Sequence, residues 1–186
     1  TFWKPFGQAD FRWIWVTSFL NAFGFYMIAV YLRNYLSDKV LPKLGDKDST
    51  GLTGMLVNNS LVATILVAVV ISIVGAVSSV VGGRLADRVG RKRVVIVSGW
   101  LMFLSLIPFA LVPSYWLIVA LAVPFGVGYG AYLSSDWALV SDILGEDQGF
   151  GRNMGLWQMS VATPQVISGG LASTLALAES TEAQQF

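Results

Sequence analysis

Long apolar stretches alternate with short polar breaks along the chain. Five stretches reach the roughly 20 helical residues that a bilayer crossing needs, at about 13–36, 55–81, 94–112, 115–142 and 153–177. Only helices and closed barrels satisfy their backbone hydrogen bonds in lipid, and unbroken apolar runs lack the alternation of barrel strands. The pattern therefore predicts an all-α fold, a polytopic transmembrane helix bundle of five spans that forms one domain over 1–186.

The breaks between the stretches differ in chemistry. Residues 42–54 are rich in Asp, Lys, Gly, Ser and Thr, residues 82–93 are basic, and residues 145–152 are polar. We expect each to be a loop. The glycines Gly126, Gly128 and Gly130 lie inside an apolar stretch with no strand before them, so they predict close helix packing rather than a nucleotide-binding loop.

Composition supports a lipid-embedded chain and excludes several other classes. Of the 186 residues 55% are hydrophobic and 12% are charged, about half the charged fraction of soluble domains. The predicted partner is therefore the lipid bilayer, and no strongly basic tract indicates nucleic acid. The chain has no Cys and no His, and no titratable cluster lies within a span. We predict no enzyme activity, no metal site and no cofactor.

The distribution of Lys and Arg predicts the orientation in the membrane. One side of the predicted bundle carries eight of these residues and the other side carries four, and the more basic side is expected in the cytoplasm. The eight are Lys4, Arg12, Arg84, Arg88, Arg91, Lys92, Arg93 and Arg152, and the four are Arg33, Lys39, Lys43 and Lys47. We therefore expect a multi-pass integral membrane protein with its N-terminus on the cytoplasmic side.

The basic break contains a motif at residues 83–92, with the sequence GRLADRVGRK. It resembles the signature loop of the major facilitator superfamily, G-x-x-x-D-[RK]-x-G-[RK]-[RK], at every specified position. The positive-inside rule alone would explain the bases, but not the two glycines and the Asp at fixed spacings. The resemblance implies a transporter of two six-helix halves around a central site.

Flanking segments resemble the C-terminal half of the sugar-transporter-like and glycoside–cation symporter members of that superfamily. The resemblance covers about 11–175 and rests on residues 11–13, 136–142, 154–157 and 164–165. It implies that the chain holds helices seven to eleven, and that the N-terminal half and a twelfth helix lie elsewhere. The expected partners are therefore a missing N-terminal half or other membrane subunits, together with a small-molecule solute.

The motif predicts a latch that holds the bundle in one conformation. Gly83 would allow close helix approach and Gly90 a tight turn. Asp87 would accept hydrogen bonds at the N-terminus of the last span, near 152–154. The basic partners in this latch are Arg88, Arg91 and Lys92, and the acids that Arg88 or Arg91 would meet are Asp136 or Asp142. For Asp136, ion coupling is the alternative role.

Polar side chains at helical spacing are candidates for solute binding. Amides both donate and accept, and aromatic faces cover apolar sugar faces, so the set suits a neutral polyhydroxylated solute. The alternative is that these groups join neighbouring helices by hydrogen bonds. The candidates are Asn21, Tyr31, Asn58, Tyr129, Tyr132, Gln158 and Gln165.

Two functions follow from this sequence. The first is a segment of a secondary active transporter that moves a small neutral solute, with sugar as one candidate and a proton or cation as a candidate coupling ion, by alternating access. The alternative is a non-transporting structural subunit of the same fold in a larger membrane complex.

The orientation can be tested with single cysteines at Lys43 and Lys92 and a membrane-impermeant thiol reagent. In right-side-out vesicles the residue 43 cysteine should react and the residue 92 cysteine should not, because the more basic side faces the cytoplasm. The reverse labelling pattern would overturn the orientation, and permeabilised vesicles, in which both sites should react, are the control.

Overall fold

The computed structural model describes residues 4–44, 51–111, 113–144 and 149–183. Within these ranges the regular elements are all helical. The chain divides into two compact units, one formed by Thr1–Leu32 with Val140–Phe186 and the other by Arg33–Leu139. Two residues that the orientation and the span boundaries used, Lys47 and Val112, lie outside the described residues.

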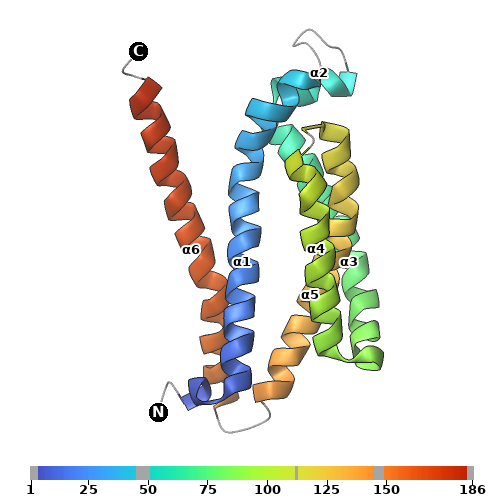
Figure 1. Cartoon of the computed structure of the whole chain (residues 1–186), viewed down its shortest axis with the longest axis vertical. Helices are drawn as coiled ribbons and strands as arrows, with labels where there is room; N and C mark the ends of the chain where they lie inside the picture. The colour runs from blue at the N-terminus through green and yellow to red at the C-terminus, as the bar shows by residue number, and fades with distance from the viewer. Residues whose placement is uncertain (1–3, 45–50, 112, 145–148, 184–186) are drawn as a thin grey trace. The chain divides into compact units, whose positions relative to one another are not determined.

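The first unit contains most of α1 (Ala9–Tyr35) and α6 (Phe150–Ala183). Two indole groups join the helices near the start of each. The Trp15 Nε1–H donates to the Leu156 carbonyl at 3.0 Å, and the buried Trp157 Nε1–H donates to the Ser18 hydroxyl at 3.2 Å. The two ribbons diverge toward the C-terminus of α6 (Figure 1). These two hydrogen bonds therefore hold the pair at one end.

The second unit contains α2 (Gly51–Asn58), α3 (Ser60–Val89), α4 (Arg91–Leu111) and most of α5 (Tyr115–Leu144). Asn59 separates α2 from α3 because its backbone is extended, with φ −141° and ψ 91°. Its side-chain oxygen accepts the backbone N–H groups of Leu61 and Val62, at 3.1 and 3.4 Å. Asn59 is thus the N-cap that starts α3 as a new helix.

Small residues on α5 allow it to pack tightly against α3 and α4. A Cβ built on Gly130 would overlap the backbone of Gly75 in α3, and one on Gly126 would lie 3.0 Å from the Ile71 carbonyl. On the α4 side, a Cβ on Gly128 would lie 2.9 Å from the Ser98 carbonyl. The prediction that this glycine series serves helix packing is confirmed.

Two polar tethers join α3 to α5 along the same contact. The Ser78 hydroxyl donates to the Val127 carbonyl at 2.6 Å, and the buried Tyr115 hydroxyl donates to the Ala63 carbonyl at 3.1 Å. Inter-helix hydrogen bonds of this kind contribute about 0.6 kcal/mol each in membrane proteins. Together with the glycine contacts they hold α3 and α5 side by side over several turns.

Among the described residues, four helical segments are long and apolar enough to cross a membrane: Ala9–Lys43, Ser60–Val89, Arg91–Phe109 and Tyr115–Leu144. The prediction of a polytopic all-α membrane protein is therefore confirmed in its coarse form. The segment predicted as a fifth span, 153–177, is helical as part of α6 but is not among these four, and some of its residues lie outside those whose side chains are described, so the count of five stays a prediction. Its polar side chains, among them Gln158, Gln165 and Ser168, lower its apolar character.

Two predicted boundaries are wrong. The span expected at 55–81 begins at Ser60, because Asn59 breaks the helix, and it continues to Val89. The loop expected at 82–93 is therefore mostly helix, with a single break at Gly90 before α4 begins at Arg91. The many bases in this segment are typical of a loop. Long basic side chains at the end of a spanning helix can, however, reach the membrane interface while the backbone stays helical.

The glycine packing predicts that a Gly-to-Ala substitution changes stability differently at two sites. Gly130→Ala should destabilise the protein by about 1–3 kcal/mol, because the added methyl group overlaps the α3 backbone and cannot rotate away. Gly99→Ala is the matched control, since no atom lies within 4 Å of its added Cβ, and it should leave stability unchanged or slightly higher. Thermal unfolding in detergent measures both, and equal effects would contradict the packing.

Candidate functional site

The signature segment forms the junction of α3 and α4. Gly90 has φ +102°, a backbone conformation that favours glycine, and its N–H donates to the Ala86 carbonyl at 2.9 Å. The carbonyl of Gly90 in turn accepts the Arg93 N–H at 3.1 Å, which begins α4. The tight turn expected at Gly90 is present in the structure, and its part in a latch stays a prediction.

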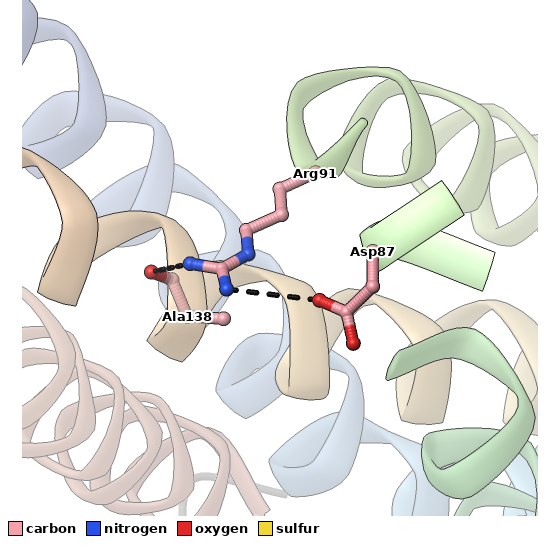
Figure 2. A network of polar contacts seen from close by, with 3 residues as sticks. All are labelled: Asp87, Arg91 and Ala138. Atoms are coloured by element: carbon pink, nitrogen blue, oxygen red, sulfur yellow. Dashed lines mark hydrogen bonds and ion pairs between the residues drawn. The ribbon is translucent and has the colours of Figure 1, made fainter. Parts of the chain in front are cut away.

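Arg91 connects this junction to α5. One guanidinium nitrogen donates to the Ala138 carbonyl at 2.7 Å, and the other lies 3.6 Å from a carboxylate oxygen of Asp87. Figure 2 shows the guanidinium between the two acceptors, which come from different helices. Because Asp87 is in the last turn of α3 and Arg91 opens α4, the ion pair spans the turn at Gly90.

The contacts of Arg91 with Asp87 and with Ala138 differ in strength. The Asp87 side chain is 69% exposed, so water screens the ion pair and its contribution is about 0.2–1 kcal/mol. The Arg91 side chain is 29% exposed, and its short charge-assisted hydrogen bond to Ala138 is the stronger contact. The main effect of Arg91 is therefore to attach the α3–α4 junction to α5.

The other members of the predicted latch are placed differently. Arg88 and Lys92 are exposed, and so are the neighbouring Arg84 and Arg93. The close helix approach expected at Gly83 occurs at Gly82, where an added Cβ would lie 2.6 Å from Ala131 of α5. At Gly83 the nearest such contact is an ordinary 3.9 Å, because consecutive helical residues point about 100° apart.

The acids of the predicted latch lie on α5. Asp136 is buried, with 5% of its surface exposed, and it precedes the carbonyl that Arg91 binds by two residues. Asp142 is exposed and belongs to the first unit, as does the N-terminal turn of α6. The pairing of Asp87 with that turn, and of Arg88 or Arg91 with Asp136 or Asp142, stays a prediction.

The candidate solute-binding residues divide between the two units. In the first unit Asn21 is half-buried, and Tyr31, Gln158 and Gln165 are exposed. In the second unit Tyr132 is buried, and the ring of Tyr129 is nearly parallel to that of Phe125, with centroids 6.4 Å apart. Each unit therefore offers polar and aromatic groups. That the groups of both units line one solute site stays a prediction.

Asn58 lines a cavity of about 510 Å³ at the α2–α3 break. The lining residues are Gly51, Gly54, Met55, Asn58, Asn59 and Val62. Asn59 was missed by sequence reasoning, although an Asn before a long apolar helical run is a recognised helix-start signal. Its side-chain oxygen is engaged in the cap, so its amide N–H groups are the ones that can face a ligand.

The unequal strength of the contacts of Arg91 with Asp87 and with Ala138 predicts that substitutions of Arg91 and of Asp87 lower stability by different amounts. Arg91→Gln should lower stability by about 1–2 kcal/mol, because it removes a charge-assisted hydrogen bond between helices. Asp87→Asn should cost less than about 0.5 kcal/mol, because its pair is exposed. Thermal unfolding in detergent compares the two. A cost for Asp87→Asn equal to that of Arg91→Gln would show that Asp87 has a stronger partner than Arg91.

Comparisons with known proteins agree with the signature segment. The model of the Major Facilitator Superfamily matches residues 14–182. The gentisate transporter of Corynebacterium glutamicum is 32% identical over 102 residues, which are 55% of this chain and 22% of that protein. The matched stretch is thus about a fifth of that relative's length, and no solved structure matches the chain. Since the superfamily model covers most of the sequence, this chain belongs to the Major Facilitator Superfamily.

Proposed function

We propose that the chain serves secondary active transport of a small solute by alternating access. The observation that carries this proposal is the signature segment, folded as a turn and attached to α5 by Arg91, in a chain of this superfamily. A cytoplasmic N-terminus, predicted by the Lys and Arg distribution, would place this junction on the inner side of the membrane.

The chain would supply one half of the transporter, the C-terminal one. Alternating access needs two bundles that enclose a site between them. Support comes from the resemblance of residues 136–142 and 154–157 to that half, and from the small share of the related transporter that the chain matches. The N-terminal half, or neighbouring subunits, would complete the fold.

In this proposal the signature segment works as a conformational latch. Asp87, with its carboxylate largely exposed, would accept hydrogen bonds at the start of α6 in one end state. Arg91 would keep the junction on α5 through the cycle. Such a latch shifts the conformational equilibrium only by the difference in its contacts between the two states.

The charge distribution favours a neutral solute such as a sugar. The sequence has no Lys or Arg in 13–32, 60–83, 94–111 or 115–144. These ranges therefore offer amide, hydroxyl and aromatic groups but no positive charge for an anion. Buried Asp136 is the candidate for coupling to a proton or a cation.

An aromatic carboxylate is the second candidate, because the related transporter is named for gentisate. A specific feature of α1 suits a planar ring: the rings of Trp15, Phe19 and Phe23 form a stack, with centroid spacings of 5.5 and 6.3 Å and interplanar angles of 15° and 4°. For such a substrate, the charge that binds the carboxylate would have to come from the other half.

Uptake by cells that express the intact transporter separates these candidates. Uptake of labelled monosaccharides, disaccharides, glycosides and gentisate should be measured in these cells and in control cells that lack the transporter. The neutral solutes should show saturable uptake above the control. Asp87→Ala should lower the maximal rate at least tenfold with little change in solute affinity, since the latch acts on one end state. Uptake of gentisate alone would replace the neutral solute by the aromatic carboxylate.

Liposomes that contain only residues 1–186 are the control for the half-transporter. They should show no saturable uptake, because one bundle cannot enclose a site between two. Selective uptake by a demonstrated monomer of these residues would overturn the proposal.

A further inference from the structure

The exposed face of α3 changes from apolar to basic along a single stripe. Ile73, Val77 and Val81 are between 61% and 66% exposed. Arg84 and Arg88, seven residues after Val77 and Val81, are exposed on the same side, since residues seven apart in a helix lie on one face. The stripe that would contact acyl chains therefore ends in two guanidinium groups.

The α4 helix repeats this arrangement in the opposite direction. Its first turn carries the exposed Lys92 and Arg93, and the apolar stripe continues from them through Ile96, Trp100 and Phe103, which are 51%, 60% and 55% exposed. Trp100 lies about 12 Å along the helix from Lys92 at 1.5 Å per residue, so its indole continues the apolar stripe away from the bases.

The two basic stripe ends meet at the Gly90 turn. Residues 84–93 contain five bases and one acid, so their net charge is 5 − 1 = +4. The acid, Asp87, is in contact with Arg91, which also reaches inward to Ala138. Among the described residues, no ion pair involves Arg84, Arg88, Lys92 or Arg93. These four bases, the outer basic quartet, are thus exposed, lie within ten residues of sequence on the two sides of the Gly90 turn, and continue the apolar stripes.

We propose that the outer basic quartet binds the phosphate of an anionic glycerophospholipid headgroup. Four cations without acid partners complement a phosphate diester, and guanidinium groups recognise it by paired hydrogen bonds. The adjoining apolar stripes then receive the acyl chains of the same lipid, a feature that a free phosphate ion or a nucleic acid would not use. The proposal concerns the outward side of the signature segment and does not depend on transport.

Titration of the purified chain in neutral detergent with phosphatidylglycerol and phosphatidylcholine, followed by native mass spectrometry, tests the site. Phosphatidylglycerol should bind at least tenfold more tightly than phosphatidylcholine, and added salt should weaken it. Arg84→Gln with Arg88→Gln should weaken it about twenty-five-fold, at about fivefold for each base removed. The double Lys variant at these positions should lose less affinity than the double Gln variant, because it keeps the charge but not the paired hydrogen bonds of the guanidinium groups.

Lys39→Gln with Lys43→Gln is the matched control, because it removes two exposed bases away from the quartet. This variant should bind phosphatidylglycerol as the unchanged chain does, and circular dichroism should show the same helix content in all variants. Equal binding of the two lipids, or equal losses in the two Gln variants, would overturn the site. Millimolar inorganic phosphate is added as a competitor. If it displaces bound phosphatidylglycerol as effectively as added lipid does, the site binds free anions and the lipid assignment is overturned.

Discussion

The close approach of α5 to α3 and α4 is the constraint on which the second unit depends. In lipid, apolar side chains do not drive helices together, because acyl chains are as apolar as leucine. Contact between backbones must supply the stability, and it requires residues without side chains. Gly75, Gly126 and Gly130 provide it on one side of α5 and Gly128 on the other. Once these helices are in contact, the turn at Gly90 brings Arg91 within reach of the α5 backbone.

That geometry divides one basic segment into two chemical surfaces. Gly90 reverses the chain within one residue, so neighbouring side chains point in different directions. Arg91 turns inward to a carbonyl, while Arg88 and Lys92 stay exposed. Arg91 thus attaches the junction to the α5 backbone, and the positive charge of the exposed bases stays available to molecules outside the bundle. The motif therefore carries more bases than the attachment to α5 requires.

Sequence reasoning succeeds where composition changes sharply and fails where geometry decides. The span predicted at 115–142 is α5 at Tyr115–Leu144, because a Pro-Ser break and a polar segment enclose it. The start of α3 was misplaced because the polar break at residues 58–60 is short and lies between two apolar stretches, and only the extended backbone of Asn59 shows that a new helix starts there. Gly82 and Gly83 look alike in sequence, and only the helix rotation selects the one that faces α5. The partner of Arg91 on α5 that Figure 2 shows is a backbone carbonyl, a group that every residue carries, so no residue pattern could have indicated Ala138.

The small residues of α5 have a consequence for how this sequence can vary. In a soluble core, both the polarity and the volume of a substituent decide whether it is tolerated. At Gly126, Gly128 and Gly130 the surrounding atoms are largely backbone, so volume is the quantity under selection. Evolutionary substitution of these glycines by alanine or serine should therefore occur only where the neighbouring helix lies farther from α5. Variation in α5 and in α3 would then be correlated in size and not in chemical character.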